Sequence, residues 1–320
     1  MKKRRLYGYA RILMLCNLIL RIMPLKQACE LSAHVMQKYS DRFLKMHCIR
    51  RNLEDAFPEL AADDVEKITR EVAANLGRHI AEMAHASAFR ANRKPASLEF
   101  DFDDSAYLSS QSPAIFVGAH LGSWELAPLA LQRHGLSLTV VYSRDKNSAM
   151  NHAIQALRQN IGGTYVEKSE GPRPIMDALA RKSSVALLVD QRVDNGIEVE
   201  FFGKRSIMTR LPSRMALKFG CPIIPFEVVR TAPCCLRVVL HEPIIPFDDK
   251  GKRAETEITQ EIAYSIQGSI ERNKKSWFCN TRRWKTRPII STSGNRQVKL
   301  ASSPKPPAKQ PSHSITNATR

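Results

Sequence analysis

The histidine and the glutamate at the two ends of the hexapeptide His-Leu-Gly-Ser-Trp-Glu are the side chains best suited to chemistry in this sequence. His120 and Glu125 lie five residues apart. Near neutral pH a histidine can take a proton from a hydroxyl. A carboxylate bonded to its other ring nitrogen fixes the tautomer and stabilises the imidazolium. We therefore expect Glu125 to fold back across the turn and orient His120. The pair has no nucleophile of its own, so it suits activation of an alcohol on a bound substrate.

The residues around this pair predict a strand, a tight turn and a helix. The apolar run from Ala114 to Ala119 is typical of a buried strand, and a helix is expected from Trp124 to Leu131. Between them, Gly122 permits a tight turn and Ser123 is a natural N-cap. His120 thus leaves the carboxyl end of a strand, where ligands bind in open α/β sheets. A histidine and an acid five residues apart also occur by chance in many proteins, so this setting carries the functional interpretation.

Strands and helices alternate along the rest of the chain. The segment from Leu31 to Phe89 has helical periodicity, and later apolar runs predict strands with helices between them. This alternation predicts an α/β fold with a mostly parallel sheet flanked by helices. The later strands are expected at Leu136–Tyr142, Val185–Val189, Glu198–Phe202, Ile223–Val229 and Leu236–Leu240, and the helices near Ser148–Asn160, Arg173–Lys182, Arg210–Phe219 and Glu255–Asn273.

Three further polar residues follow predicted strands and are candidates for binding substrate. Asp190 and Gln191 follow one apolar run, and Arg144 lies just beyond another. Because the carboxyl ends of parallel strands form the ligand end of a sheet, we expect these side chains to contact substrate. For Arg144 the alternative interpretation is a solvated loop arginine.

The hexapeptide from His120 to Glu125 resembles the His-x-x-x-x-Asp/Glu motif of glycerolipid acyltransferases. It is most similar to the His-x-Gly-Asn/Ser-Trp-Glu variant of the late acyltransferases of bacterial lipid A biosynthesis. Further blocks resemble this family in the family's order, and together they cover roughly residues 1–285. They are Arg51-Asn52-Leu53, Phe57-Pro58-Glu59, Val141-Tyr142-Ser143-Arg144 with Lys146-Asn147, Leu188-Val189-Asp190-Gln191, Phe201-Phe202-Gly203, Pro222-Ile223-Ile224-Pro225-Phe226, Trp277 and Arg282-Arg283-Trp284-Lys285.

The resemblance implies a membrane-associated O-acyltransferase that needs no cofactor. Its acyl donor would be a thioester on acyl carrier protein, and its acceptor a 3-hydroxyacyl hydroxyl of a lipid A precursor. His120 and Glu125 would be the catalytic pair. Backbone amides near Gly122 and Ser123, or the Arg144 side chain, would stabilise the oxyanion. The resemblance also implies an N-terminal membrane anchor.

This sequence departs from the family pattern in three places. Ser143 separates Tyr142 from Arg144, where the family often has Arg directly after Tyr. A usual Gly-containing stretch is replaced by residues 209–213, and Thr281 stands where the family often has His. These departures fall where acyl and sugar-phosphate groups are expected, so they bear on the substrate and not on the catalytic pair.

The positive charge of this chain is concentrated at its two ends. The formal net charge is +18, yet residues 52–285 are nearly neutral. A nucleic-acid enzyme would carry basic residues on its folded body. Basic ends beside an apolar segment suit the anionic lipids of a membrane, so we expect lipid partners and no nucleic acid.

Residues 1–25 are expected to form a membrane-anchoring or interfacial helix. Arg11 and Arg21 interrupt its apolar stretch, so the uncharged run Ile12–Leu20 is too short to span a bilayer core. A cleaved signal peptide would begin in the same way, but no convincing cleavage site follows. We expect an acyltransferase domain over residues 26–285 and, because the composition cannot build a core, a disordered basic tail over residues 286–320.

The seven cysteines indicate a cytosol-facing protein. Their number is odd and none forms a Cys-x-x-Cys pair, so we expect reduced thiols and no metal site. Together with the resemblance, this predicts a Gram-negative inner-membrane protein whose catalytic domain faces the cytoplasm.

Three other functions are weighed against this one. The chain could acylate a different lipid, such as a lysophospholipid or an amino-acid lipid. A basic nucleic-acid-binding protein is disfavoured by the neutral body, and a non-catalytic membrane scaffold is disfavoured by the intact His120 and Glu125 pair.

Overall fold

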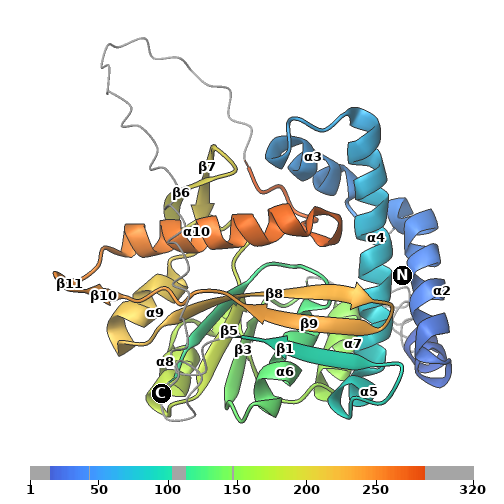
Figure 1. Cartoon of the computed structure of the whole chain (residues 1–320), viewed down its shortest axis with the longest axis horizontal. Helices are drawn as coiled ribbons and strands as arrows, with labels where there is room; N and C mark the ends of the chain where they lie inside the picture. The colour runs from blue at the N-terminus through green and yellow to red at the C-terminus, as the bar shows by residue number, and fades with distance from the viewer. Residues whose placement is uncertain (1–14, 43, 103–112, 146–147, 285–320) are drawn as a thin grey trace, which may run out of the picture. The chain divides into compact units, whose positions relative to one another are not determined.

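A seven-stranded sheet is the centre of the fold. The computed structural model describes residues 15–42, 44–102, 113–145 and 148–284. The strand order is β1-β9-β8-β2-β5-β3-β4, and every neighbouring pair is parallel except β8 and β9 (Figure 1). The predicted α/β fold with a mostly parallel sheet is confirmed. The strands are β1 (Ser97–Asp101), β2 (Ile115–Gly118), β3 (Leu138–Tyr142), β4 (Thr164–Glu167), β5 (Ser184–Leu188), β8 (Ile223–Ala232) and β9 (Cys235–Leu240).

Strand β2 lies in the middle of the sheet and is buried on both faces. All four of its residues are buried, as a continuous apolar run in a covered parallel sheet should be. Ile115 and Val117 belong to one hydrophobic core, and Phe116 belongs to a second core. The sheet is therefore the middle layer between two helical layers.

The helices on the two faces supply the two cores. In Figure 1, α10 lies on one side of the sheet and α6 on the other. The first core takes side chains from α3 (Met46–Ala56), α8 (Arg173–Ala180), α9 (Leu211–Phe219) and α10 (Glu255–Arg272). The second takes side chains from α2 (Leu25–Tyr39), α5 (Ala86–Arg90), α6 (Ala127–Arg133) and α7 (Ser148–Gln159). The long helix α4 (Ala62–Ala84) contributes to both.

Several elements differ from the sequence prediction. The helix expected from Trp124 begins as a 3₁₀ turn, Trp124–Leu126, before α6. The strand expected near residues 198–202 is β6 (Ile197–Phe201), but it pairs with β7 (Lys204–Met208) in a separate antiparallel hairpin. Strands β1 and β4 were not predicted. A further small hairpin joins β10 (Phe247–Asp248) and β11 (Gly251–Lys252), and single 3₁₀ turns occur at Ser40–Arg42, Lys168–Glu170 and Lys274–Ser276.

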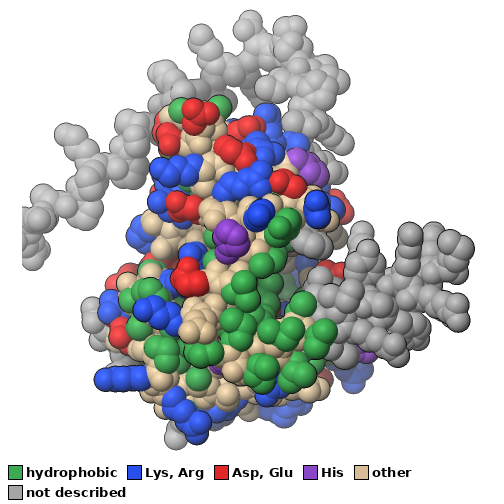
Figure 2. All heavy atoms as spheres, turned by 90° about the vertical axis from the view of Figure 1, so that its right-hand side faces the viewer, with side chains coloured by type: hydrophobic (Ala, Val, Ile, Leu, Met, Phe, Trp, Pro, Cys, Tyr) green, Lys and Arg blue, Asp and Glu red, His purple; other side chains and the backbone are tan. Residues whose placement is uncertain are grey.

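The N-terminal part of the described chain presents an apolar face. Residues 15–22 are helical, and α2 follows. Figure 2 shows hydrophobic side chains gathered over this side of the molecule. Among the described residues, no helix has both the length and the apolar character needed to cross a membrane. The first fourteen residues of the predicted anchoring helix and the predicted disordered tail over residues 286–320 lie outside the described residues. The exposed large side chains of this face are Leu15, Leu18, Ile19, Ile22, Leu31 and Val35.

Candidate active site

Strand register brings His120 and Asp190 together. Strands β2 and β5 are parallel neighbours, with Gly118 opposite Leu188. His120 and Asp190 each lie two residues beyond these positions, at the same edge of the sheet. The ring Nδ1 of His120 lies 2.7 Å from Oδ1 of Asp190. Two residues that the sequence places at strand ends thus form one hydrogen-bonded pair.

Asp190 is held as a carboxylate in the protein interior. It is fully buried, and its second oxygen accepts a hydrogen bond from Nε1 of Trp277 at 2.9 Å. Burial alone would raise the pKa of Asp190, but the charge and hydrogen bond of His120 and the hydrogen bond of Trp277 outweigh it, so the pKa is lowered. An ionised acceptor on Nδ1 leaves Nε2 of His120 as the proton-accepting nitrogen.

Glu125 does not orient His120, and that expectation is wrong. Its carboxylate is bonded by Arg158 of α7, from Nε at 2.9 Å and from Nη2 at 2.5 Å. The Arg158 guanidinium also lies over the rings of Tyr142 and Tyr165, at 4.7 and 5.5 Å. The 3₁₀ turn that starts at Trp124 directs Glu125 towards this aromatic surface, away from His120.

The other predicted site residues lie at different distances from His120. The side-chain amide of Gln191 is 3.4 Å from Nε2 of His120, so it lines the reactive side of the ring. Arg144 is exposed beyond β3, and within the described residues it has no hydrogen bond or ion pair to this pair. Ser123 is fully buried, and its hydroxyl donates to Glu82. The Ser123 side chain therefore does not face a substrate.

Gly122 allows the loop from His120 to Ser123, named the catalytic loop below, to press against β8. Its φ is +55°, and a Cβ at this position would lie 2.3 Å from the carbonyl oxygen of Val228. Any other residue would be strained here and would push the loop away from the sheet. The prediction that backbone amides near Gly122 and Ser123 bind the oxyanion remains a prediction.

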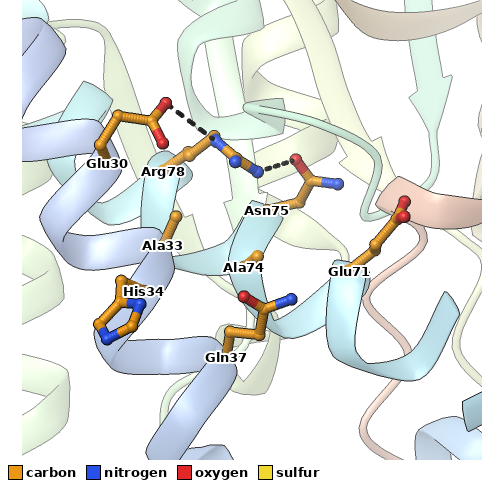
Figure 3. Close-up of a pocket in the computed structure, with 8 residues that line it drawn as sticks. All are labelled: Glu30, Ala33, His34, Gln37, Glu71, Ala74, Asn75 and Arg78. Atoms are coloured by element: carbon orange, nitrogen blue, oxygen red, sulfur yellow. Dashed lines mark hydrogen bonds and ion pairs between the residues drawn. The ribbon is translucent and has the colours of Figure 1, made fainter. Parts of the chain in front are cut away.

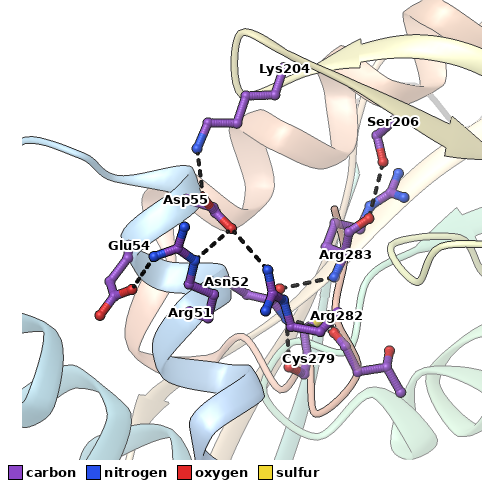
Figure 4. Close-up of polar contacts among 10 residues, drawn as sticks. Arg51, Asn52, Glu54, Asp55, Lys204, Ser206, Cys279, Arg282 and Arg283 are labelled. Carbon is purple, nitrogen blue, oxygen red and sulfur yellow. Dashed lines mark hydrogen bonds and ion pairs between the residues drawn. The ribbon is translucent and has the colours of Figure 1, made fainter. Parts of the chain in front are cut away.

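The segment after α10 closes the site from the other side. Its backbone N–H at Phe278 donates to the carbonyl of His120 at 2.9 Å. Asn52 of α3 anchors this segment, since its Nδ2 donates to the carbonyls of Cys279 and Thr281 at 2.9 and 2.7 Å, and its Oδ1 accepts from the Arg283 N–H at 2.9 Å (Figure 4). Two distant motif blocks of the sequence are thus joined.

A hollow of about 390 Å³ lies between α2 and α4. Figure 3 shows it lined by polar side chains, with Arg78 between Glu30 and Asn75. Neither His120 nor Asp190 lines it. Among the described residues, no group of three or more His, Cys, Asp or Glu side chains is arranged to hold a metal ion.

Several residues of this site carry no signal in the sequence alone. Arg158 lies within one predicted helical stretch, and Glu82 and His79 lie within the predicted helical segment from Leu31 to Phe89. Trp277 belongs to a motif block, but only the structure shows its bond to Asp190.

Comparisons with known proteins show that the chain is similar to lipid acyltransferases. The family model for bacterial lipid A biosynthesis acyltransferases matches residues 2–286. The chain is 23% identical over 260 residues to a phosphatidylinositol mannoside acyltransferase of Mycolicibacterium smegmatis, covering 79% of this chain and 82% of that protein. It is 30% identical over 126 residues to the protein of the same name in Mycobacterium tuberculosis, covering 38% and 40%.

Among similar solved structures is the crystal structure of the 1-acyl-sn-glycerophosphate acyltransferase of Thermotoga maritima, with a TM-score of 0.38 and 13% identity, over 83% of this chain and 100% of that one.

Proposed function

This chain belongs to the bacterial lipid A biosynthesis acyltransferase family, and we propose that it moves a fatty acyl chain from a thioester to a lipid hydroxyl, with His120 as general base. That it is an acyltransferase acting on lipid follows from the family. The observation that carries the catalytic assignment is the 2.7 Å contact between His120 Nδ1 and the buried Asp190 carboxylate.

The geometry supports a simple proton-transfer mechanism. Nε2 of His120 takes the proton of the acceptor hydroxyl, and the oxygen attacks the thioester carbonyl. The tetrahedral intermediate collapses to the ester, the carbon–sulfur bond breaks, and the imidazolium returns its proton to the thiolate. Asp190 stabilises the imidazolium throughout. Gln191, at 3.4 Å from Nε2, is placed to orient the acceptor hydroxyl.

Glu125 has a different role in this proposal. It fixes Arg158 over the rings of Tyr142 and Tyr165, and the Arg158 charge binds an anionic group of the substrate. Burial alone would lower the pKa of Arg158, but its bonds to Glu125 outweigh that effect and raise it, so the guanidinium stays charged. Both side chains are 11% exposed.

The specific substrates rest on the family. We take acyl carrier protein as the thiol carrier of the donor, and the 3-hydroxyacyl hydroxyl of a lipid A precursor as the acceptor. The relatives named phosphatidylinositol mannoside acyltransferases favour a second candidate, a sugar hydroxyl of such a glycolipid. A lysophospholipid or an amino-acid lipid is a third acceptor class.

The proposed location is the cytoplasmic face of a Gram-negative inner membrane. The apolar face formed by residues 15–22 and α2 would lie in the lipid interface. Anionic lipids would then contact the basic residues of the N-terminal region.

The test is acyl transfer by purified full-length protein, with each acceptor class offered in detergent and acyl-carrier-protein or coenzyme A thioesters as donors. We expect His120→Ala to lower the rate about 10²- to 10⁴-fold. Asp190→Asn should cause a comparable loss, because the amide neither fixes the tautomer of the neutral imidazole nor stabilises the imidazolium. Glu125→Gln should raise KM more than it lowers kcat.

Two results would contradict this proposal. Near-normal turnover by His120→Ala would exclude the general-base mechanism. A kcat for Glu125→Gln as low as that of His120→Ala, with normal turnover by Asp190→Asn, would restore Glu125 as the partner of His120.

A further inference from the structure

A buried ion pair lies directly beneath the catalytic loop, and the mechanism above does not use it. Glu82 of α4 is fully buried. Arg230 of β8 binds both of its oxygens, from Nε to Oε1 at 2.9 Å and from Nη2 to Oε2 at 2.7 Å. Arg230 is itself held by Asn75, through Nη1 at 2.8 Å. Because a buried ion pair adds little net stability, what it positions matters more than its energy.

The ion pair is connected to the catalytic loop by one hydroxyl. Ser123 is fully buried and donates its hydroxyl hydrogen to Oε2 of Glu82, the same oxygen that Nη2 of Arg230 binds. The preceding residue, Gly122, packs against the carbonyl oxygen of Val228. Val228 and Arg230 are two residues apart on β8. Consecutive residues of the loop are therefore attached to one short stretch of a central strand.

Aromatic rings carry this attachment to the catalytic histidine. Nδ1 of His79 lies 3.3 Å from the Ser123 hydroxyl, and its ring stacks on Trp124 with 4.0 Å between centroids. The ring of Trp124 in turn meets the ring of His120 edge to face, at 5.2 Å. His120 is thus packed from behind by the loop residue that follows Ser123 and is bonded on its other side by Asp190.

We propose that Glu82 is a positioning residue for the reaction: clamped by Arg230, it holds Ser123 and so keeps the His120 ring in line with Asp190. This inference rests on the role of His120 proposed above. A displacement of about 1 Å at a reacting group can cost on the order of 10²-fold in rate. Glu82 acts through Ser123 and does not contact the substrate.

Ser123→Ala is the first test, because it removes one hydroxyl and leaves the ion pair in place. In the full-length protein we expect kcat to fall about 10- to 100-fold, with KM for donor and acceptor within about twofold of the original. The downfield proton resonance of the His120 Nδ1–H group should weaken or shift, since the contact with Asp190 loosens. A residue with a purely structural role would not move this resonance.

Glu82→Gln tests whether Ser123 acts through the carboxylate. It should lower kcat in the same way, and the double variant Ser123→Ala with Glu82→Gln should be no slower than the slower single variant. Glu227→Gln is the matched control. Like Glu82, Glu227 is a buried glutamate, but it lies on β8 and is bonded by Arg272 and Asn273. Among the described residues it has no bond to the catalytic loop, so the kcat of the Glu227→Gln variant should stay within about twofold of the original.

Three results would contradict the positioning role of Glu82. The first is a normal kcat with an unchanged resonance in Ser123→Ala. The second is a double variant in which the two losses multiply, and the third is a loss of kcat in Glu227→Gln equal to that in Glu82→Gln. His120→Ala separates this inference from the proposed function. If His120→Ala is inactive while Ser123→Ala is normal, only the positioning role of Glu82 is wrong. If His120→Ala is active, the general-base mechanism is wrong.

Discussion

At the scale of single residues, the partner of a histidine at a strand end is decided by geometry and not by spacing in the chain. Glu125 is five residues from His120, yet its carboxylate is taken by Arg158. Asp190 is seventy residues away and is bonded to the ring. The 3₁₀ turn Trp124–Leu126 sets the direction of the Glu125 side chain, whereas strand register places Asp190 beside His120.

His79 shows what burial does to a histidine at this site. Its side chain is enclosed between Ser123 and Trp124. Burial, together with the positive charges of Arg230, His120 and Arg158, lowers its pKa to about 3. The folded protein therefore holds His79 neutral at neutral and mildly acidic pH.

A pH-dependent loss of stability follows. His79 has its ordinary pKa of about 6.5 only in the unfolded chain, so the unfolded state binds more protons below that pH and stability falls as the pH drops. From pH 7 to pH 5 we expect His79 to account for ~2 kcal/mol of lost unfolding free energy. Urea unfolding of the original protein and of His79→Gln at both pH values measures this. The same pH slope in both proteins would contradict it, and the subtraction removes the contribution of His241, whose pKa is also lowered.

At the scale of elements, one helix and one C-terminal segment depend on a single amide. Asn52 is buried, with only 1% of its surface exposed, and makes three hydrogen bonds to the backbone of residues 279–283. That segment continues from Trp277, which bonds Asp190, and from Phe278, whose N–H bonds His120. Holding α3 against this segment is therefore also a way of holding the site.

We expect Asn52→Ala to lower the unfolding free energy by about 2–4 kcal/mol, because three backbone groups lose their partner, two of them in buried hydrogen bonds. Asn160→Ala is the control, since within the described part of the chain the Asn160 side chain makes one hydrogen bond, which is long, at 3.4 Å, and exposed to solvent. This variant should lose less than ~0.5 kcal/mol of unfolding free energy. Urea unfolding of both variants measures the difference. Equal, small effects would mean that the amide bonds do not anchor the segment.

At the scale of the whole molecule, the exposed apolar face is the feature that indicates a partner surface. The face formed by residues 15–22 and α2 leaves large side chains in water, including Ile22 at 75% and Leu18 at 58% exposure. Soluble proteins rarely expose a continuous patch of this kind without a partner surface. A membrane interface is the partner that suits a lipid acyltransferase.

Changing this face should weaken membrane binding without changing the chemistry. The double variant Leu18→Ser with Ile22→Ser should bind anionic vesicles about 10- to 100-fold less tightly, because two side chains worth ~1.5–3 kcal/mol each when fully buried are only partly inserted. Tyr264→Ser on α10 is the matched control, since Tyr264 is 53% exposed and lies outside the apolar face. Vesicle co-sedimentation measures binding, and transfer in detergent should be unchanged. Equal binding by both variants would mean that the face is not the docking surface.

The sequence alone determines the class of the fold and the centre of the site. The continuous apolar run of β2, followed by His120, Gly122 and Ser123, predicts a buried central strand with a histidine at its carboxyl end, and the structure has this arrangement. Hydrophobic periodicity is a local property of the sequence, so it identifies the strands and helices. Their alternation predicts the parallel sheet. Asp190 and Gln191 are predicted at a strand end for the same reason, and both lie at His120.

Only the tertiary structure decides which of these residues touch. Strand order is not a local property, so nothing in the sequence places β5 beside β2 or sends β6 into a separate hairpin. The pairing of Asp190 with His120, and of Glu125 with Arg158, follows from that order and from the direction of a single turn. Contacts across long loops depend on how whole elements pack, and side-chain types and spacings along the chain carry no information about that packing.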